Sequence, residues 1–300
     1  MLKIAFDPLY VHPLPVGHRF PMLKYELISE QLIYEGVVES ENFFKPRPIE
    51  EGYITLAHKP SYWWKLKTLS LSSKEVRRTG FLLTEQLIKR ELSIVQGTID
   101  ACSFALQNGI AFNVAGGTHH AGSDWGEGFC LLNDQAIGAH YLLKHRKAKK
   151  ILIVDLDVHQ GNGTAEIFEN EDSVFTFSMH SQRNFPFRKK KSDLDIALFD
   201  DMKDDAYLDI LQKHMHSIIN RIKPDFIFYQ AGVDVLATDK LGWLSLTKMG
   251  CKLRDEIVFE YCKQFGLPIQ VSMGGGYSPL IRDIVDAHCN TFKAAIDKLF

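Results

Sequence analysis

A short apolar run that ends in charged residues constrains this chain more than any other segment. The run Ile151-Leu152-Ile153-Val154 has the composition of a buried strand, and Asp155-Leu156-Asp157-Val158-His159 follows it directly. Side chains alternate along a strand, so Asp155, Asp157 and His159 are predicted to point to one side. Ionisable groups at the end of a buried strand are costly to desolvate unless they are paired or bind a metal. The segment therefore predicts part of a divalent-metal site, and the alternative is a hydrogen-bonded polar strand end.

The rest of the chain alternates short apolar, β-branched runs with amphipathic stretches of helical length. This pattern is typical of a parallel sheet covered by helices. Strands are expected at residues 3–6, 110–115, 151–155, 173–178, 225–230 and 268–273. Helices are expected at residues 22–35, 85–108, 133–144, 205–222 and 247–264, with Pro21 at a helix start and Gly36 and Gly109 at helix ends. Residues 8–21, 58–73 and 181–198 are expected to be surface loops.

No repeat, low-complexity tract or linker divides the sequence. We therefore predict an α/β fold in which residues 1–300 form a single domain with a central, mostly parallel β-sheet flanked by helices.

Composition and charge exclude several classes of protein. The net charge is −2 at pH 7, which gives no field over the whole molecule that would attract nucleic acid, and no basic docking surface is evident. No window approaches the roughly 20 apolar residues that span a bilayer, and the N-terminal segment lacks the apolar core of a signal peptide. The five cysteines form no CxxC motif and are expected to be reduced, buried thiols. These features predict a cytoplasmic protein without a membrane span or a nucleic-acid partner.

Polar, chemically capable residues follow four of the predicted strands. They are Gly116-Gly117-Thr118-His119-His120, then Asp155, Asp157 and His159, then Ala231-Gly232-Val233-Asp234, and finally Gly274-Gly275-Gly276-Tyr277. Ligands of an open parallel sheet bind beyond the carboxyl ends of its strands, so we expect these four segments to meet at one edge.

The residue types at this edge suit metal-assisted hydrolysis of an amide or ester. Asp157, His159 and Asp234 supply the three protein ligands that a catalytic zinc usually has. The pair His119-His120 offers a general base and a general acid, and the Tyr277 hydroxyl could donate to a developing oxyanion. Each element also has a simpler interpretation, namely surface histidines for the pair and a turn with a packed tyrosine for the glycine-rich segment.

The motifs together resemble the zinc-dependent histone deacetylase family over nearly the whole chain. The motifs are Gly116-Gly117-Thr118-His119-His120-Ala121, Gly128-Phe129-Cys130, Asn133-Asp134, Asp155-Leu156-Asp157-Val158-His159-Gln160-Gly161-Asn162-Gly163 and Gly274-Gly275-Gly276-Tyr277. The segments Gln160-Gly161-Asn162-Gly163 and Asp239-Lys240-Leu241-Gly242 look most like class IV and its bacterial homologues. The resemblance implies the arginase/deacetylase-like fold and removal of acetyl or longer fatty acyl groups from lysine.

Carried over to this chain, the resemblance implies the following roles. Zn²⁺ would be bound by Asp157, His159 and Asp234, although their donor set would also accept Fe²⁺. The catalytic group would comprise His119, His120, Tyr277, Asp155 and Asn162, with His120 nearer the general base and Asp155 orienting His119. A structural K⁺ would be held around Asp155, Asp157, His159, Ser178 and Met179. The substrate would contact Gly128, Phe129, Phe185, Leu241 and Gly275, with Phe185 forming the wall opposite Phe129 and Leu241 lying deeper.

The sequence departs from the best-known members at two positions. Asn162 replaces a second aspartate behind the histidine pair, so His120 is predicted to be protonated less easily than His119. Gln160 replaces a second histidine and is expected to change the support beneath the metal and not its ligands.

Three other functions stay open at this point. One is hydrolysis of an acetylpolyamine or another small acylated amine in place of an acyl-lysine protein or peptide. The second is an arginase-type ureohydrolase with two metal ions, although Asp234 has no second aspartate two residues away. The third is an inactive module that binds acyl-lysine.

Overall fold

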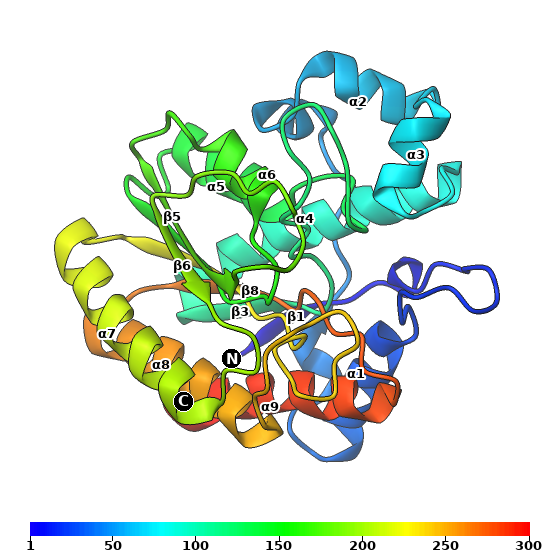
Figure 1. The fold of residues 1–300 in the computed structure, drawn as a ribbon. Coiled ribbons are helices and arrows are strands. Elements are labelled where there is room, and N and C mark those ends of the chain that lie inside the picture. The colour runs from blue at the N-terminus through cyan, green and yellow to red at the C-terminus, as the bar shows by residue number, and fades with distance from the viewer.

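Eight strands form one sheet in the order β2-β1-β3-β8-β7-β4-β5-β6 in the computed structural model, which describes all 300 residues (Figure 1). Every neighbouring pair is parallel, so the predicted α/β fold is confirmed, with a sheet that is parallel throughout. The strands are β1 Lys3–Ala5, β2 Phe43–Phe44, β3 Ile110–Asn113, β4 Ile151–Asp155, β5 Val174–Ser181, β6 Leu194–Leu198, β7 Phe226–Gln230 and β8 Ile269–Ser272.

Helices cover both faces of this sheet. Figure 1 shows α1, α7, α8 and α9 on one side and α4, α5 and α6 on the other, with α2 and α3 beyond α4. The α-helices are α1 Lys24–Tyr34, α2 Pro60–Lys67, α3 Ser73–Thr79, α4 Glu85–Asn108, α5 Asp134–Lys144, α6 Asn162–Ile167, α7 Asp204–Ile222, α8 Lys248–Phe265 and α9 Ile281–Leu299. Short 3-10 helices span Pro8–Tyr10, Ser40–Asn42 and Glu51–Leu56.

The four central strands end level with one another. Asn113 at the end of β3 lies opposite Ser272 of β8, Ser272 lies opposite Gln230 of β7, and Gln230 lies opposite Asp155 of β4. All residues of these strands are buried, because helices pack on both faces. The loops that follow the four strands therefore start side by side at one edge of the sheet.

The eleven predicted strands and helices are confirmed, and six were missed, namely β2, β6, α2, α3, α6 and α9. The predicted loop at residues 58–73 contains α2, and α3 begins with a capping box between Ser72 and Glu75. The predicted loop at residues 181–198 contains β6, a partly buried edge strand whose polar residues hide its period. The largest omission is α9, although its buried positions at Ile284, His288 and Phe292 have helical spacing.

The cysteines and the helices bear on two further expectations. All five cysteines are free and buried, as predicted. None of the helices is both long enough and apolar enough to cross a membrane.

His58 is a buried imidazole that joins two segments of the chain. Its Nδ1 donates to the Gly122 carbonyl and its Nε2 accepts from the Asn133 N–H, both at 2.9 Å. Only 2% of the residue is exposed, and burial lowers its pKa to about 4. The folded protein therefore holds His58 in its neutral form.

We predict that His58 makes folding sensitive to mild acid. The unfolded chain binds a proton near pH 6.5 and the folded chain only near pH 4, so the free energy of unfolding decreases as the pH falls between these values. The loss at pH 4 amounts to about 3 kcal/mol. At pH 8 a His58→Gln variant will have a lower free energy of unfolding than the parent, as measured by urea unfolding. The difference between the two free energies will become smaller toward pH 4. A constant difference would contradict this assignment.

Candidate active site

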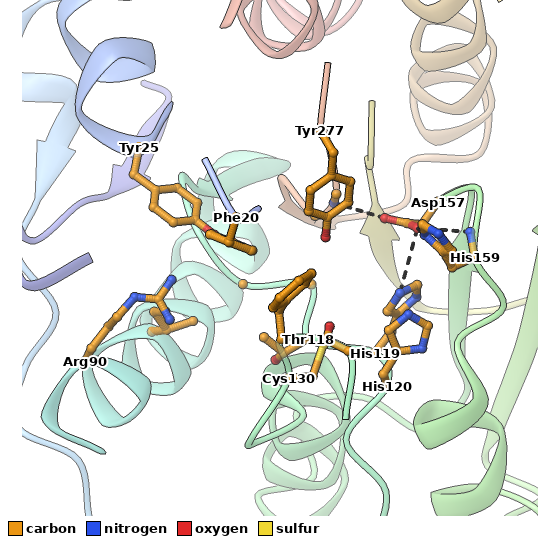
Figure 2. Close-up of a pocket in the computed structure, with 17 residues that line it drawn as sticks. Phe20, Tyr25, Arg90, Thr118, His119, His120, Cys130, Asp157, His159 and Tyr277 are labelled. Atoms are coloured by element: carbon orange, nitrogen blue, oxygen red, sulfur yellow. Dashed lines mark hydrogen bonds and ion pairs between the residues drawn. The ribbon is translucent and has the colours of Figure 1, made fainter. Parts of the chain in front are cut away.

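The loops after three of the four central strands, β3, β4 and β8, line one cavity. It is lined by Gly116–His120 after β3, Asp157 and His159 after β4, and Gly274, Gly275 and Tyr277 after β8. Asp234, after β7, lies against one of the lining residues, with its Oδ2 3.1 Å from His159 Nδ1. Figure 2 shows His119, His120, Asp157 and His159 grouped at one end, with Tyr277 pointing toward them. The predicted meeting of four segments at one edge of the sheet is therefore observed.

Asp157, His159 and Asp234 bring three metal-ligating side chains together. Their donor atoms all lie within 4.8 Å of one another, and all three residues are buried. His159 Nδ1 is 3.1 Å from both Asp157 Oδ1 and Asp234 Oδ2. A tetrahedral divalent ion about 2.1 Å from each donor would hold the donors about 3.4 Å apart. The set therefore fits a divalent ion with two oxygen ligands and one nitrogen ligand.

Backbone hydrogen bonds in the β4 loop aim these side chains. The Asp157 N–H donates to Asp155 Oδ1 at 3.2 Å, and the Val158 N–H donates to Asp234 Oδ1 at 2.9 Å. β4 ends at Asp155, so Asp157 and His159 lie outside the strand. Asp157 and His159 do converge, but the expected reason, the alternation of side chains along a strand, is wrong. A hydrogen-bonded loop after the strand brings them together.

Gly275 packs directly against the metal donors. Its N–H donates to Asp157 Oδ2 at 2.9 Å, and a Cβ at this position would lie 2.0 Å from Asp234 Oδ2. The residue also lines the cavity. Glycine is required here because the backbone must approach two carboxylates closely.

The two histidines have different partners. His119 Nδ1 donates to Asp155 Oδ2 at 2.7 Å, and His120 Nδ1 donates to Asn162 Oδ1 at 2.8 Å. Burial lowers the pKa of His119, but the Asp155 and Asp157 carboxylates outweigh it and raise that pKa to about 9. Burial, together with the neighbouring His119 and His159, holds the pKa of His120 well below its usual value. His120 therefore has the lower pKa of the two histidines, as predicted from the presence of Asn162 beside it.

The Glu127 carboxylate binds Asn162 on the side away from His120. The Asn162 Nδ2 donates to Glu127 Oε1, and Arg78 Nε donates to Glu127 Oε2 at 2.7 Å. The amide is thereby fixed with its oxygen toward His120, which leaves His120 Nε2 as the unprotonated nitrogen. Sequence reasoning missed Glu127, and only its place beside the Gly128-Phe129-Cys130 motif hinted at it.

Tyr277 is held over the cavity by Asp239. Asp239 Oδ2 accepts from the Tyr277 N–H at 2.6 Å, while Oδ1 accepts from the Leu241 and Gly242 N–H groups at 2.8 Å. One carboxylate thus joins the loops after β7 and β8. Burial raises the pKa of Tyr277 well above its usual value, so its hydroxyl stays protonated and can donate. Asp239 was noticed in a motif but received no role from the sequence.

The predicted channel residues lie where the cavity opens outward. Gly128, Phe129, Phe185 and Leu241 all line a groove that also reaches His120, His159 and Tyr277. The Phe129 ring is 5.9 Å from the Tyr277 ring, and the Phe185 ring is 4.9 Å from the His120 ring. The expectation that Leu241 lies deeper is wrong, because it lines the outer groove and not the inner cavity.

The inner end of the cavity is formed by residues that the sequence did not reveal. Phe20, Tyr25 and Arg90 lie there, away from the histidine pair (Figure 2). Arg90 is buried beside Glu91, and its Nε donates to the Tyr10 carbonyl at 2.9 Å. The enclosed volume is only about 30 Å³. These residues come from elements that carry no motif, so local sequence gave no signal for them.

The predicted potassium residues that are not metal donors lie on the neighbouring strands β4 and β5. Asp155 of β4 is paired in register with Ser178 of β5, and Met179 follows on the same buried strand. Gln160 fastens the neighbouring loop, since its Nε2 donates to the Lys190 carbonyl at 2.6 Å and to Asp195 Oδ1 at 2.8 Å. Gln160 therefore stabilises the loop that carries Phe185, and the expected change in the support beneath the metal stays a prediction.

Comparison with known proteins relates the whole chain to one family and fold. The family described as histone deacetylase domain matches residues 18–292. An uncharacterized protein of Picosynechococcus is 42% identical over 98% of both chains. Histone deacetylase 2 of Arabidopsis thaliana is 27% identical over 87% of this chain and 70% of its own length. The crystal structure of the HDA15 HD domain is similar in fold, with a TM-score of 0.85, 23% identity and coverage of 99% of this chain and 88% of that one.

We predict that Asn162→Asp moves the acid limb of the pH profile of kcat/KM for amide hydrolysis. A carboxylate beside His120 Nδ1 favours the imidazolium, so the pKa of His120 rises and the limb shifts upward by about one pH unit. The neutral Asn162→Ala variant is the control, and its limb should not move upward. An unchanged profile in Asn162→Asp would contradict the role given to His120.

We predict that Asp239→Asn lowers kcat about tenfold or more by loosening Tyr277. The amide side chain of the variant has only one oxygen, so its NH₂ group would face the backbone N–H of either Tyr277 or Leu241. The loop that carries that N–H group then loses its hydrogen-bond acceptor. In a Tyr277→Phe background the further loss should be threefold or less. Asp204→Asn is the matched control, because Asp204 accepts from the Thr247 N–H and hydroxyl away from the cavity. Equal losses in both backgrounds would assign Asp239 to stability alone.

Proposed function

The chain belongs to the histone deacetylase family, and we propose that it is a metal-dependent hydrolase that removes a short acyl group from the ε-amine of lysine. The observation that carries the proposal is the position of three metal-ligating donors beside a histidine pair and a tyrosine hydroxyl on one cavity. These groups have complementary chemical capacities, and none of them is explained by packing alone.

Asp157, His159 and Asp234 would hold the metal, with Zn²⁺ as the family's usual ion and Fe²⁺ as a fitting substitute. A divalent ion at this position would polarise a carbonyl group and lower the pKa of a water molecule. Asp155, Ser178 and Met179, with Asp157 and His159, would hold a structural K⁺ behind it. The whole of residues 1–300 would form this one catalytic domain.

The chain's own residues would manage the protons. His120, neutral and with Nε2 unprotonated, would take the proton from the attacking water. His119, whose pKa is raised beside Asp155, would carry positive charge near the reacting carbonyl. The Tyr277 hydroxyl would donate to the carbonyl oxygen as charge develops there, and its high pKa keeps that proton in place.

The size of the inner cavity favours a short acyl group. The inner cavity offers only about 30 Å³, far less than a fatty acyl chain needs, so we expect an acetyl or similarly short group. Phe20, Tyr25 and Ile94 close the space beyond it. The acyl-lysine stem would lie between Phe129 and Phe185.

Two of the alternative functions are less well supported by the site. A ureohydrolase needs a second cluster of metal carboxylates, and the residues form one group of three donors. A binding-only module has no use for a positioned Tyr277 and a polarised histidine pair. Metal content and turnover separate these alternatives from the deacylase.

The first experiment compares hydrolysis of ε-acyl-lysine peptides whose acyl groups run from acetyl to myristoyl. We expect the zinc-loaded protein to bind one ion and to favour the acetyl peptide. Asp157→Ala should lower kcat about a hundredfold or more and reduce bound zinc.

The control is Asp209→Ala, which removes an exposed carboxylate of α7 and should change neither quantity. Two ions per chain would favour a ureohydrolase. One ion with no turnover of any peptide would overturn acyl-lysine hydrolysis, and preference for the myristoyl peptide would overturn the short acyl group.

A further inference from the structure

A groove of about 590 Å³ leads outward from the candidate active site. It shares His120, His159, Phe129 and Tyr277 with the inner cavity, so a substrate whose acyl group reaches the metal donors must lie along this groove. Its outer residues would therefore contact whatever surrounds the acylated amine.

Cations outnumber carboxylates along the groove. Arg19, Arg77, Arg78 and Lys240 line it, and Glu127 is the one carboxylate among the 17 lining residues. Glu127 is already bound to Arg78 and to Asn162. Arg19, Arg77 and Lys240 are exposed, and none of the salt bridges in the structure involves them. Their charge is available to a ligand.

The groove also has exposed aromatic surface. Phe187 is 82% exposed and Trp243 is 43% exposed, and both line the groove with Phe185. One further cation lies nearby, since Lys190 and the groove residue Arg78 are 5.6 and 5.4 Å from the same Trp125 ring. Aromatic side chains beside cations suit an extended peptide with acidic side chains.

We propose that this groove selects acyl-lysine peptides in which acidic residues flank the acylated lysine. The inference rests on the proposed acyl-lysine hydrolysis and adds the charge of the substrate. It disfavours acylated polyamines, because their remaining ammonium groups would face Arg19, Arg77 and Lys240. The sequence concealed this surface because its cations come from three separate segments: the loop before α1, α3, and the loop after β7.

The effect must depend on salt, because the three cations are exposed. Interactions between exposed charges are screened over about 8–10 Å at physiological ionic strength. We therefore expect the selection to act mainly through the encounter of enzyme and peptide, and thus through kcat/KM at low salt.

The test uses three acetyl-lysine peptides that differ only in flanking residues, which are Glu, Gln or Lys. We expect kcat/KM to decrease in that order, with about a tenfold difference between Glu and Lys at 20 mM salt that shrinks at 300 mM. Arg77→Gln and Lys240→Gln should each lower the ratio of the Glu to the Gln peptide several-fold. The matched control Lys213→Gln removes an exposed cation of α7, across the sheet from α3, and should leave that ratio unchanged (Figure 1).

Fluorescence anisotropy with the same three peptides gives a readout that needs no turnover. Binding in the expected order without hydrolysis would support the groove and overturn the proposed function. Hydrolysis of all three peptides alike at low salt would overturn the groove's selectivity and leave the function standing. A short single-stranded oligonucleotide that competes at lower concentration than the acidic peptide would assign the groove to nucleic acid instead.

Discussion

The carboxylates of Asp157 and Asp234 lie close together in a buried site, and the surrounding hydrogen bonds hold them in this arrangement. Burial and the nearby Asp157 raise the pKa of Asp234 to about 7, so two negative charges without a cation are unfavourable at this position. Backbone N–H groups of Val158 and Gly275 donate to these carboxylates and hold their orientation. A divalent cation is the partner that would relieve the remaining repulsion.

A second layer of carboxylates connects this centre to the surface. Asp239 ties the Tyr277 loop to the loop that carries Leu241. Glu127 ties Asn162, and through it His120, to Arg78 at the groove. Each carboxylate has one end at a residue of the proposed reaction and the other at a residue of the groove. Charge-assisted hydrogen bonds therefore join the groove to the residues around the cavity.

The sequence predicted the sheet and the chemical core of the site for a clear reason. Fully buried strands such as Ile151–Asp155 read as continuous apolar runs, and polar residues directly after such runs are costly unless they have a role. The edge strand Leu194–Leu198 was missed because it is only partly buried and its composition is mixed. Helix α9 was missed although the helical spacing of its buried residues is visible in the sequence.

By itself, the sequence determined the parallel α/β fold and the order of the chemical groups along the chain, and it predicted the three side chains that could hold a metal. Only the tertiary structure decided which residues close the inner cavity, that Leu241 lies in the outer groove, and that Glu127 and Asp239 support the histidine pair and Tyr277. The physical reason is the separation along the chain of the residues that interact. Strand composition and motif spacing are local properties, whereas cavity depth and second-layer hydrogen bonds join segments tens to hundreds of residues apart, whose distances no local pattern encodes.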